Sequence, residues 1–309
     1  MKIFDLHADI GYDVMQKKES ENKIVEMYHV PKFKKGEVAY VGMASYFEGE
    51  ESWDDMKEMV LSLKEDLSMC KSVDIIENHD DLKENDHIKA FLTIEGMCGI
   101  KDDPEEKINW LYKQGIRIAS LCWNEENELA AGARANKNQG LKPLGKRVIE
   151  EMIRLGMLVD VSHANEKTFY DIMEYKEALV IATHSNARAL CDHPRNLTDE
   201  QIIAIAKRDG LIGINSAPVF VHEDKKKQDI PHLVKHMRYI KELVGVKYIA
   251  LGMDFMDFFK GYETFHTKGL EDCTKMQSLI YEMQGQGFTT YEIEAIAYKN
   301  ALRKMKEVI

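Results

Sequence analysis

Six residues of the types that bind metal ions or move protons stand in or at the ends of short apolar segments of this chain. They are His7 and Asp9 in FDLHADI, Glu95 in TIEG, His163 in LVDVSHA, His184 in ATHS and Asp254 in ALGMDF. Imidazole nitrogen and carboxylate oxygen both coordinate Zn²⁺, and a carboxylate between two ions can bridge them. Two such ions would activate a water and polarise a carbonyl, so we expect metal-assisted hydrolysis.

Taken singly, each of these residues has an ordinary structural interpretation. A histidine near a strand end is commonly a hydrogen-bonded structural residue, and a glutamate before a glycine, such as Glu95, commonly belongs to a turn or cap. A His-x-Asp triplet also occurs often by chance. The joint pattern favours a site, because the candidates gather at the same end of successive strands.

Eight short apolar segments, each a candidate strand, carry or flank these residues. They are Phe4 to Ile10, Glu37 to Phe47, Ile88 to Gly96, Ile116 to Asn124, Leu155 to Ala164, Ala178 to Ser185, Gly210 to Ala217 and Tyr248 to Phe255. Stretches with helical periodicity separate them. This alternation predicts an α/β fold, a (β/α)8 TIM barrel with closing C-terminal helices at Glu271 to Gln284 and Tyr291 to Glu307. An open doubly wound sheet is the main alternative, weakened because no G-x-G-x-x-G follows the first strand.

The first candidate strand alternates apolar and charged residues, which predicts two different faces. Its apolar positions are Phe4, Leu6, Ala8 and Ile10. We expect these to pack outward on helices, so that Asp5, His7 and Asp9 point into the barrel. Burying those charges would be costly unless something compensates them. Asp5 has two open interpretations: it could orient His7 or pair with an internal basic group.

Composition favours one compact domain over residues 1–309, because 44% of the residues are hydrophobic, only six are proline and no linker interrupts the chain. A net charge of -11 argues against nucleic acid or an anionic membrane as a partner. Five cysteines without a CxxC pair indicate free thiols in a reducing compartment. With no signal-peptide core and no apolar run near the roughly 20 residues of a membrane span, we expect a cytoplasmic protein.

At these residues the chain resembles the membrane (renal) dipeptidase family of zinc peptidases, within the amidohydrolase group of barrels. The resemblance covers nearly the whole chain and rests on DLHADI, TIEG, GLKPLGKRVIEEMIRLGMLVDVSHA, ATHSNARALCDHPRNLTDE and ALGMDF. His163 and His184 stand 21 residues apart, as the family pattern requires. The resemblance implies two Zn²⁺ per chain, with His7 and Asp9 on one, His163 and His184 on the other, and Glu95 bridging both.

The resemblance also implies roles for two further residues. Asp254 matches an aspartate beside the zinc-bound water, a general acid/base that passes a proton to the leaving amine. Arg195 matches the arginine that recognises a substrate carboxylate, a task that suits a guanidinium fork. A surface residue ahead of the Thr198 helix cap is the alternative for Arg195.

Together these roles predict a binuclear zinc dipeptidase in which a metal-bridging hydroxide attacks the peptide bond. The resemblance further implies short peptide substrates, including L-D dipeptides and sometimes β-lactam-like amides, and a homodimer.

The chain departs from the family pattern at two places. Mammalian members carry a substrate-contacting histidine after the fourth strand, whereas Trp123 stands at or next to that position here and cannot be protonated. A buried aromatic residue is the alternative for Trp123. The family's DFDG reads DFMDF here, with Met256 in place of the second aspartate and Asp257 one position later. These departures motivate an alternative, another amidohydrolase acting on cyclic amides, lactones or phosphoesters; a barrel that binds without turnover is a third hypothesis.

Overall fold

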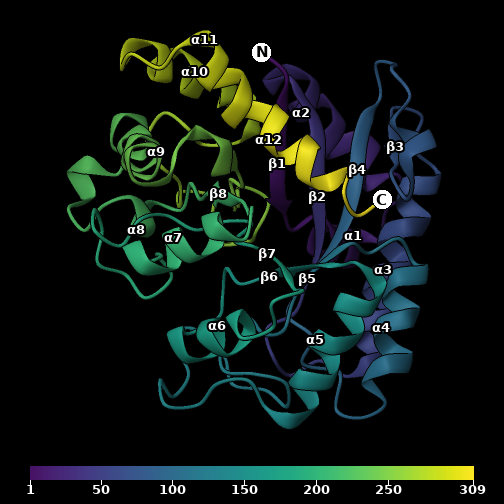
Figure 1. Cartoon of the computed structure of the whole chain (residues 1–309). Coiled ribbons are helices and arrows are strands. Elements are labelled where there is room, and N and C mark those ends of the chain that lie inside the picture. Colours follow the sequence, from purple (N-terminus) through teal and green to yellow (C-terminus); the bar gives the residue numbers. More distant parts are fainter.

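The computed structural model describes all residues 1–309, and its centre is a ring of eight parallel strands (Figure 1). The strands of the sheet are β1 (Ile3–Ala8), β2 (Val38–Tyr46), β3 (Val73–Ile75), β4 (Ile88–Glu95), β5 (Ile118–Ser120), β6 (Leu158–Asp160), β7 (Leu179–Ile181), β8 (Ile212–Ile214) and β9 (Ile249–Leu251). Neighbours follow the order β7-β6-β5-β4-β2-β1-β9-β8. The ring closes between β7 and β8, where the Gly213 amide donates to the Ala182 carbonyl at 2.7 Å. The predicted TIM barrel is therefore confirmed.

Each of the eight predicted strands overlaps one strand of the ring, and seven contain theirs entirely; β1 begins one residue before the predicted Phe4. One further strand, β3, was not predicted. It pairs with β4 and is not part of the ring. It is only three residues long, and its sequence VDI lies in a stretch rich in charged residues, which hides the strand pattern.

Helices surround the ring in the order expected from the alternation (Figure 1). They are α1 (Ile10–Lys17), α2 (Val30–Gly36), α3 (Trp53–Ser68), α4 (Pro104–Lys113), α5 (Pro143–Leu155), α6 (Glu166–Met173), α7 (Asp199–Lys207), α8 (Pro218–Val221), α9 (Ile230–Val244), α10 (Met276–Gly285), α11 (Thr290–Glu294) and α12 (Asn300–Met305). The last three occupy the predicted closing segments. No helix combines the length and the apolar character that crossing a bilayer requires, and all five cysteines are free thiols.

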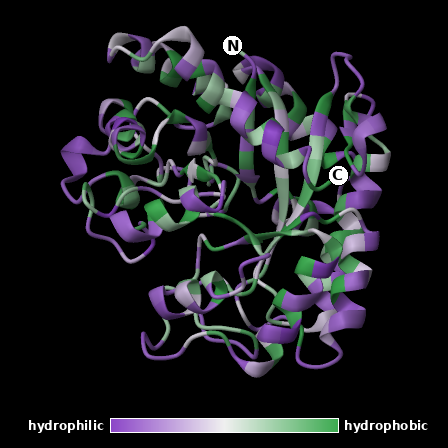
Figure 2. Ribbon diagram, viewed as in Figure 1, coloured by the Kyte–Doolittle hydropathy of each residue, from purple (hydrophilic) through white to green (hydrophobic).

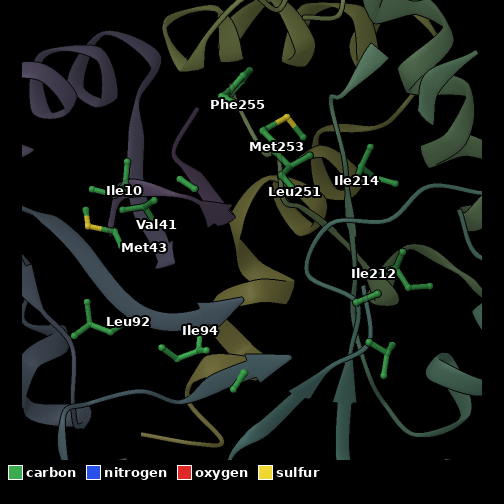
Figure 3. Packing of buried hydrophobic residues seen from close by; sticks show 14 of the residues in the cluster. Ile10, Val41, Met43, Leu92, Ile94, Ile212, Ile214, Leu251, Met253 and Phe255 are labelled. Atoms are coloured by element: carbon green, nitrogen blue, oxygen red, sulfur yellow. The ribbon is translucent and has the colours of Figure 1, made fainter. Parts of the chain in front are cut away.

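The main apolar core lies between the ring and its helices. Outward-facing strand residues form it together with the inner faces of the helices; the strand residues include the labelled Val41, Met43, Leu92, Ile94 and Ile214 of Figure 3. Figure 2 shows the consequence for the helices, whose ribbons alternate between green and purple while the strands are mostly green or white. This pattern is that of amphipathic helices laid on a buried sheet.

A second apolar cluster fills the interior of the barrel. It includes Phe4, Phe91, Ile118, Leu158 and Ile181, which come from five strands of the ring. The C-terminal segment completes this cluster with Ala301, Met305 and Val308. Figure 1 shows the yellow helix α12 passing in front of β1 and β2, so the chain closes the barrel end near its own N-terminus.

The expected orientation of β1 is wrong at its beginning. Phe4 and Leu6 belong to the interior cluster rather than to the layer under the helices. The Phe4 ring stacks on Phe91 inside the barrel, with ring centroids 5.1 Å apart.

A bulge in β1 explains why the inward face changes along the strand. Asp5 pairs with Val41 and Ala8 pairs with Met43, so three steps on β1 match two steps on β2. The extra residue reverses the alternation, so His7 joins Leu6, its neighbour in sequence, on the inward side. The expectation for His7 was therefore correct for a reason that the alternation alone does not contain.

Candidate metal centre and substrate pocket

The barrel brings all six candidate residues together at the C-terminal ends of its strands. His7 lies within β1 and Asp9 just after it, Glu95 ends β4, His163 follows β6, His184 follows β7 and Asp254 follows β9. Five of them are at most 5% exposed, and Asp254 is partly exposed to the pocket above them. Strand ends of a parallel barrel meet at one rim, which is why residues 247 positions apart in sequence, 7 to 254, become neighbours.

Glu95 lies between two groups of nitrogen and oxygen donors. Its Oε2 is 3.5 Å from His7 Nε2, which is itself 3.2 Å from Asp9 Oδ1. Its Oε1 is 2.6 Å from His163 Nε2 and 3.4 Å from His184 Nε2. The two oxygens of one carboxylate thus face different imidazoles, although the ligand atoms of His7, Glu95 and His184 also lie within 4.8 Å of one another.

The donor atoms of this cluster fit a cation better than they fit one another. His7 Nε2 and Asp9 Oδ1 are buried without a hydrogen-bond partner, a state that native proteins rarely leave uncompensated. His163 Nε2 and His184 Nε2 converge to 2.8 Å. Imidazole nitrogens and carboxylate oxygens at these positions are a donor set that suits Zn²⁺.

Burial shifts the pKa of every ligand candidate discussed here, and neighbouring charges add to or oppose that shift. Burial raises the pKa of Glu95 to about 8, and the nearby Asp9 charge adds to this. Burial lowers the pKa of His7, but Glu95 and Asp9 outweigh it, so that the His7 pKa lies well above its ordinary value. Burial lowers the pKa of both His163 and His184, which keeps them as neutral imidazoles, the form that binds metals.

The residue after Glu95 explains how its carboxylate reaches the centre. Gly96 has φ +82, a left-handed conformation that turns the chain directly after β4. A Cβ at Gly96 would lie 2.9 Å from the Phe47 carbonyl oxygen. The Gly96 amide also donates to Ser120 Oγ at 2.8 Å, which fixes this turn to β5.

Asp254 is held in a strained backbone conformation beside the cluster. Its φ of +57 is unfavourable for a residue with a side chain, at a cost of about 1–3 kcal/mol. Asn215 Nδ2 donates to Asp254 Oδ2 at 3.0 Å, while Oδ1 lies 3.9 Å from His7 Nε2. Burial raises the Asp254 pKa, so this carboxyl is suited to hold a proton.

Sequence reasoning missed two residues that hold the imidazoles from behind. Asn124 Oδ1 lies 3.2 Å from His163 Nδ1, and Thr183 Oγ1 lies 2.8 Å from His184 Nδ1. Both contacts leave the Nε2 atoms facing Glu95. Asn124 and Thr183 adjoin residues already singled out, and that adjacency was the available signal.

A cavity of about 180 Å³ opens above the cluster. Asp9, Glu95, His163 and Asp254 form part of its wall. The rest is largely aromatic, contributed by Tyr46, Trp123, Phe220, Phe259, Tyr262 and Phe265. The space suits a small substrate with apolar groups above a polar centre.

Arg195 lines this cavity, and it is only 4% exposed, so the surface-residue alternative is wrong. Its Nη2 lies 3.0 Å from His163 Nε2 and donates to the His184 carbonyl at 3.4 Å. Its Nε and Nη1 atoms are buried and have no partner. Burial lowers the Arg195 pKa to about 10, which still leaves the guanidinium charged at neutral pH. Two free donors of a cation thus remain for a ligand.

The residues at the two departures from the family pattern differ in whether they line the cavity. Trp123 lines the cavity with its ring 6.0 Å from that of His163, and it is partly exposed rather than buried. Met256 also lines the cavity. Asp257 lies outside the cavity wall and forms an ion pair with Lys32 on α2, whose Nζ donates to Asp257 Oδ2 at 2.5 Å.

Asp5 serves the backbone rather than a side chain. Its Oδ1 accepts from the Met253 amide at 2.8 Å and from the His7 amide at 3.3 Å. Burial raises the Asp5 pKa to about 7. The residue joins β1, next to its bulge, to the end of β9, which neither sequence interpretation had described.

Comparison with known proteins gives a consistent result. A sequence model of the membrane dipeptidases, peptidase family M19, matches residues 1–309. An uncharacterized dipeptidase of Schizosaccharomyces pombe is 34% identical over 223 residues, which cover 71% of this chain and 53% of that protein. The chain therefore spans about half the length of this relative. A Klebsiella pneumoniae protein encoded in the pqqA 5′ region is 30% identical over 82% of this chain and 93% of its own length.

Among solved structures, a Rhodobacter sphaeroides metallo peptidase, bound to a phosphinate mimic of L-Ala-D-Ala, superposes with a TM-score of 0.86. It is 19% identical, and the match covers 100% of this chain and 99% of that one. This likeness shows that the two chains share the barrel fold.

Proposed function

We propose that this chain, which belongs to the membrane dipeptidase family, peptidase family M19, hydrolyses dipeptides at the buried cluster. One observation carries the proposal: the two Glu95 oxygens face two donor sets, 3.5 Å from His7 and 2.6 Å from His163, beneath a cavity that also exposes Arg195. A metal-binding centre and a site for a terminal carboxylate therefore stand next to each other.

The metal ions of this proposal are two Zn²⁺ per chain. His7 and Asp9 would hold one, His163 and His184 the other, and Glu95 both. When bound, such ions lower the pKa of an attacking water and polarise the peptide carbonyl. The unpartnered His7 Nε2 and Asp9 Oδ1 support this assignment.

Arg195 binds the C-terminal carboxylate of the substrate. Its Nε and Nη1 atoms have no partner, so both stay free to donate to a carboxylate oxygen, and the charge of the guanidinium attracts that group. Because His163 lies 3.0 Å from Nη2 of the same group, a carboxylate there places the adjacent peptide bond over the cluster. Trp123 and Tyr46 then cover the substrate from the side of the cavity.

Asp254 moves the proton. Its Oδ2 is held by Asn215, while Oδ1 faces His7 and the cavity. This carboxylate takes a proton from the attacking water and gives it to the nitrogen of the leaving amine. The raised Asp254 pKa favours holding that proton between the two steps.

The substrates we propose are short peptides, including those with a D-residue at the second position. The phosphinate mimic of L-Ala-D-Ala in the Rhodobacter sphaeroides structure supports this stereochemistry. A homodimer, a cytoplasmic location and a single functional domain over residues 1–309 stay predictions from the sequence.

The experiment is hydrolysis of L-L and L-D dipeptides by zinc-loaded protein, with a lactone and a phosphotriester in the same panel. We expect turnover of dipeptides, and a fall in kcat of about 100-fold or more in Asp254→Asn. Asparagine tolerates the left-handed backbone at this position, so the variant is matched in shape. Turnover of the lactone or phosphotriester alone, or full activity in Asp254→Asn, would contradict the proposal.

A metal count tests the centre separately. We expect mass spectrometry of the purified protein to find about two zinc ions per chain. Folded protein that takes up no metal from a zinc-containing buffer would exclude the proposed centre.

A further inference from the structure

We propose that Thr183, held by the carboxylate of Asp160, is a positioning residue that fixes His184 with its proton on Nδ1 and its lone pair on Nε2. The consequence for metal binding rests on the proposed function. The tautomer itself does not, because the groups that set it are all present in the chain.

The chain of hydrogen bonds begins at Asp160, which ends β6 and is 4% exposed. Its Oδ1 accepts from the Ser162 amide and the Thr183 amide, both at 3.0 Å. An amide N–H can only donate, so Oδ1 must be an acceptor. Ser162 Oγ also donates to Oδ1 at 2.6 Å, and itself accepts from the His184 amide at 3.0 Å.

The second Asp160 oxygen determines where the Thr183 proton points. Thr183 Oγ1 donates its single proton to Asp160 Oδ2 at 2.5 Å. The hydroxyl then has only lone pairs left for His184 Nδ1, which lies 2.8 Å away. His184 Nδ1 must therefore carry the ring proton, and Nε2 keeps its lone pair.

That lone pair points at the centre of the cluster. His184 Nε2 lies 3.4 Å from Glu95 Oε1 and 2.8 Å from His163 Nε2. A metal-binding imidazole needs its free nitrogen directed in this way, and the groups behind it set the tautomer.

Asp160→Asn is the sharpest test, because it changes one oxygen to an amide nitrogen. The asparagine oxygen must stay at the two backbone amides, so its NH₂ takes the Oδ2 position and donates to Thr183 Oγ1. Two acceptors then face the Thr183 proton, His184 Nδ1 at 2.8 Å and Ser162 Oγ at 3.2 Å. The shorter contact favours His184 Nδ1, so we expect His184 to carry its proton on Nε2 instead. Thr183→Val removes the hydroxyl that links Asp160 to His184 while keeping the shape of the side chain. Thr183→Ser keeps this hydroxyl.

Two measurements follow on these variants. Long-range ¹H–¹⁵N NMR of metal-free protein with ring-¹⁵N histidine reads the tautomer, with His184→Gln identifying the signals. We expect Nδ1–H in wild type and Thr183→Ser, Nε2–H in Asp160→Asn, and loss of the fixed tautomer in Thr183→Val. Chelator competition should show zinc binding about 10–100-fold weaker in Asp160→Asn and Thr183→Val, and unchanged in Thr183→Ser.

Thr93→Val is the matched control. Thr93 is also a buried threonine of the barrel interior, two positions before Glu95, but its hydroxyl has no partner. We expect the His184 tautomer and the zinc affinity of the Thr93→Val variant to match those of the wild-type protein. The inference is overturned if Asp160→Asn and Thr183→Val keep Nδ1–H, or if they change tautomer without losing zinc affinity. Wild-type protein that binds no zinc would contradict the proposed function, while the metal-free spectra would still decide the tautomer.

Discussion

Arg195 is the residue whose environment is hardest to explain without a ligand. It is buried, yet two of its guanidinium nitrogens have no partner, and an unpaired buried donor costs about 1–3 kcal/mol. The aromatic ring of Phe220, 5.5 Å from the guanidinium carbon, compensates only part of this. A carboxylate in the cavity would supply an acceptor for these nitrogens and a counter-charge for the guanidinium.

We therefore predict that Arg195→Lys lowers kcat/KM for a dipeptide about 100-fold. Lysine keeps the charge but lacks the planar guanidinium, so its hydrogen bond to the carboxylate is misplaced or lost. The corresponding dipeptide amide, which has no terminal carboxylate, should be affected far less. Steady-state kinetics on both substrates measure this, and an equal loss on the two would show that Arg195 does not bind the carboxylate.

At the scale of elements, the ring closes where β8 and β9 press against the end of β7. A Cβ at Gly213 would lie 1.8 Å from the Thr183 carbonyl oxygen, and one at Gly252 would lie 1.7 Å from the same atom. Both contacts are with a backbone atom, which, unlike a flexible side chain, cannot move away to make room for a Cβ. These glycines are therefore required for strand approach beside His184.

We predict that Gly213→Ala lowers the free energy of unfolding by about 3 kcal/mol. The control is Gly285→Ala at the exposed end of α10, where a Cβ would meet nothing within 4 Å. That variant should be neutral or up to about 1 kcal/mol more stable, since alanine favours helix. Urea titration of both proteins compares them, and similar stability would contradict the close packing of β7 against β8.

A buried histidine on α9 makes stability depend on pH. His236 Nδ1 accepts from the Ala187 amide at 3.2 Å, and its Nε2 donates to the Val221 carbonyl at 2.9 Å. A second ring proton would face an N–H donor. Burial, together with charge repulsion from His222 and His232, lowers the His236 pKa to about 4.

This histidine predicts a loss of stability on acidification. Its folded-state pKa lies below the ordinary 6.5, so the unfolded chain binds more protons between pH 6.5 and about 4. The contribution of neutral His236 to the free energy of unfolding is fully present above pH 6.5. It falls by about 3 kcal/mol as the pH drops through this window. In His236→Gln this part of the loss should vanish, so the stability gap to wild type should narrow as pH falls. Parallel urea-stability profiles from pH 7 to 4 would exclude the effect.

The sequence alone predicted the elements better than their registers. Eight strands and the rim position of the six candidates follow from alternation and topology, because parallel strand ends always meet at one side. The bulge between Asp5 and Ala8 depends on how β1 pairs with β2, which no single strand reveals. Asn124 and Thr183 were missed for a related reason: a polar residue beside a site residue does not show which ring nitrogen it contacts.

At the scale of the whole molecule, the barrel has an apolar end and a polar end. Its interior cluster, closed by Met305 and Val308 of the C-terminal segment, excludes water from below the site. The opposite end gathers carboxylates and imidazoles from β1, β4 and the segments after β6 and β7. A cation bound there would therefore link strands that are not adjacent in the ring. The backbone hydrogen bonds connect these strands only indirectly, through the strands between them.

Removing metal should accordingly lower the stability of the entire barrel. A ligand at 1,000 times its Kd contributes about 4 kcal/mol, which corresponds to a fall in Tm of about 10 °C for a chain of this size. We predict this fall on treatment with a chelator, and recovery with zinc. Magnesium should not restore the Tm, because it prefers six oxygen ligands over imidazole.

His87→Ala is the control for this thermal measurement, since His87 contacts Asp74 at 2.9 Å, just before β4 begins and far from the rim. It should keep the full response to zinc, whereas His163→Ala should lose most of it. A Tm that does not change when metal is removed would mean that the cluster is stable without a cation. In that case the buried carboxylates must be neutralised by protons, as the raised Glu95 pKa of about 8 already allows in metal-free protein.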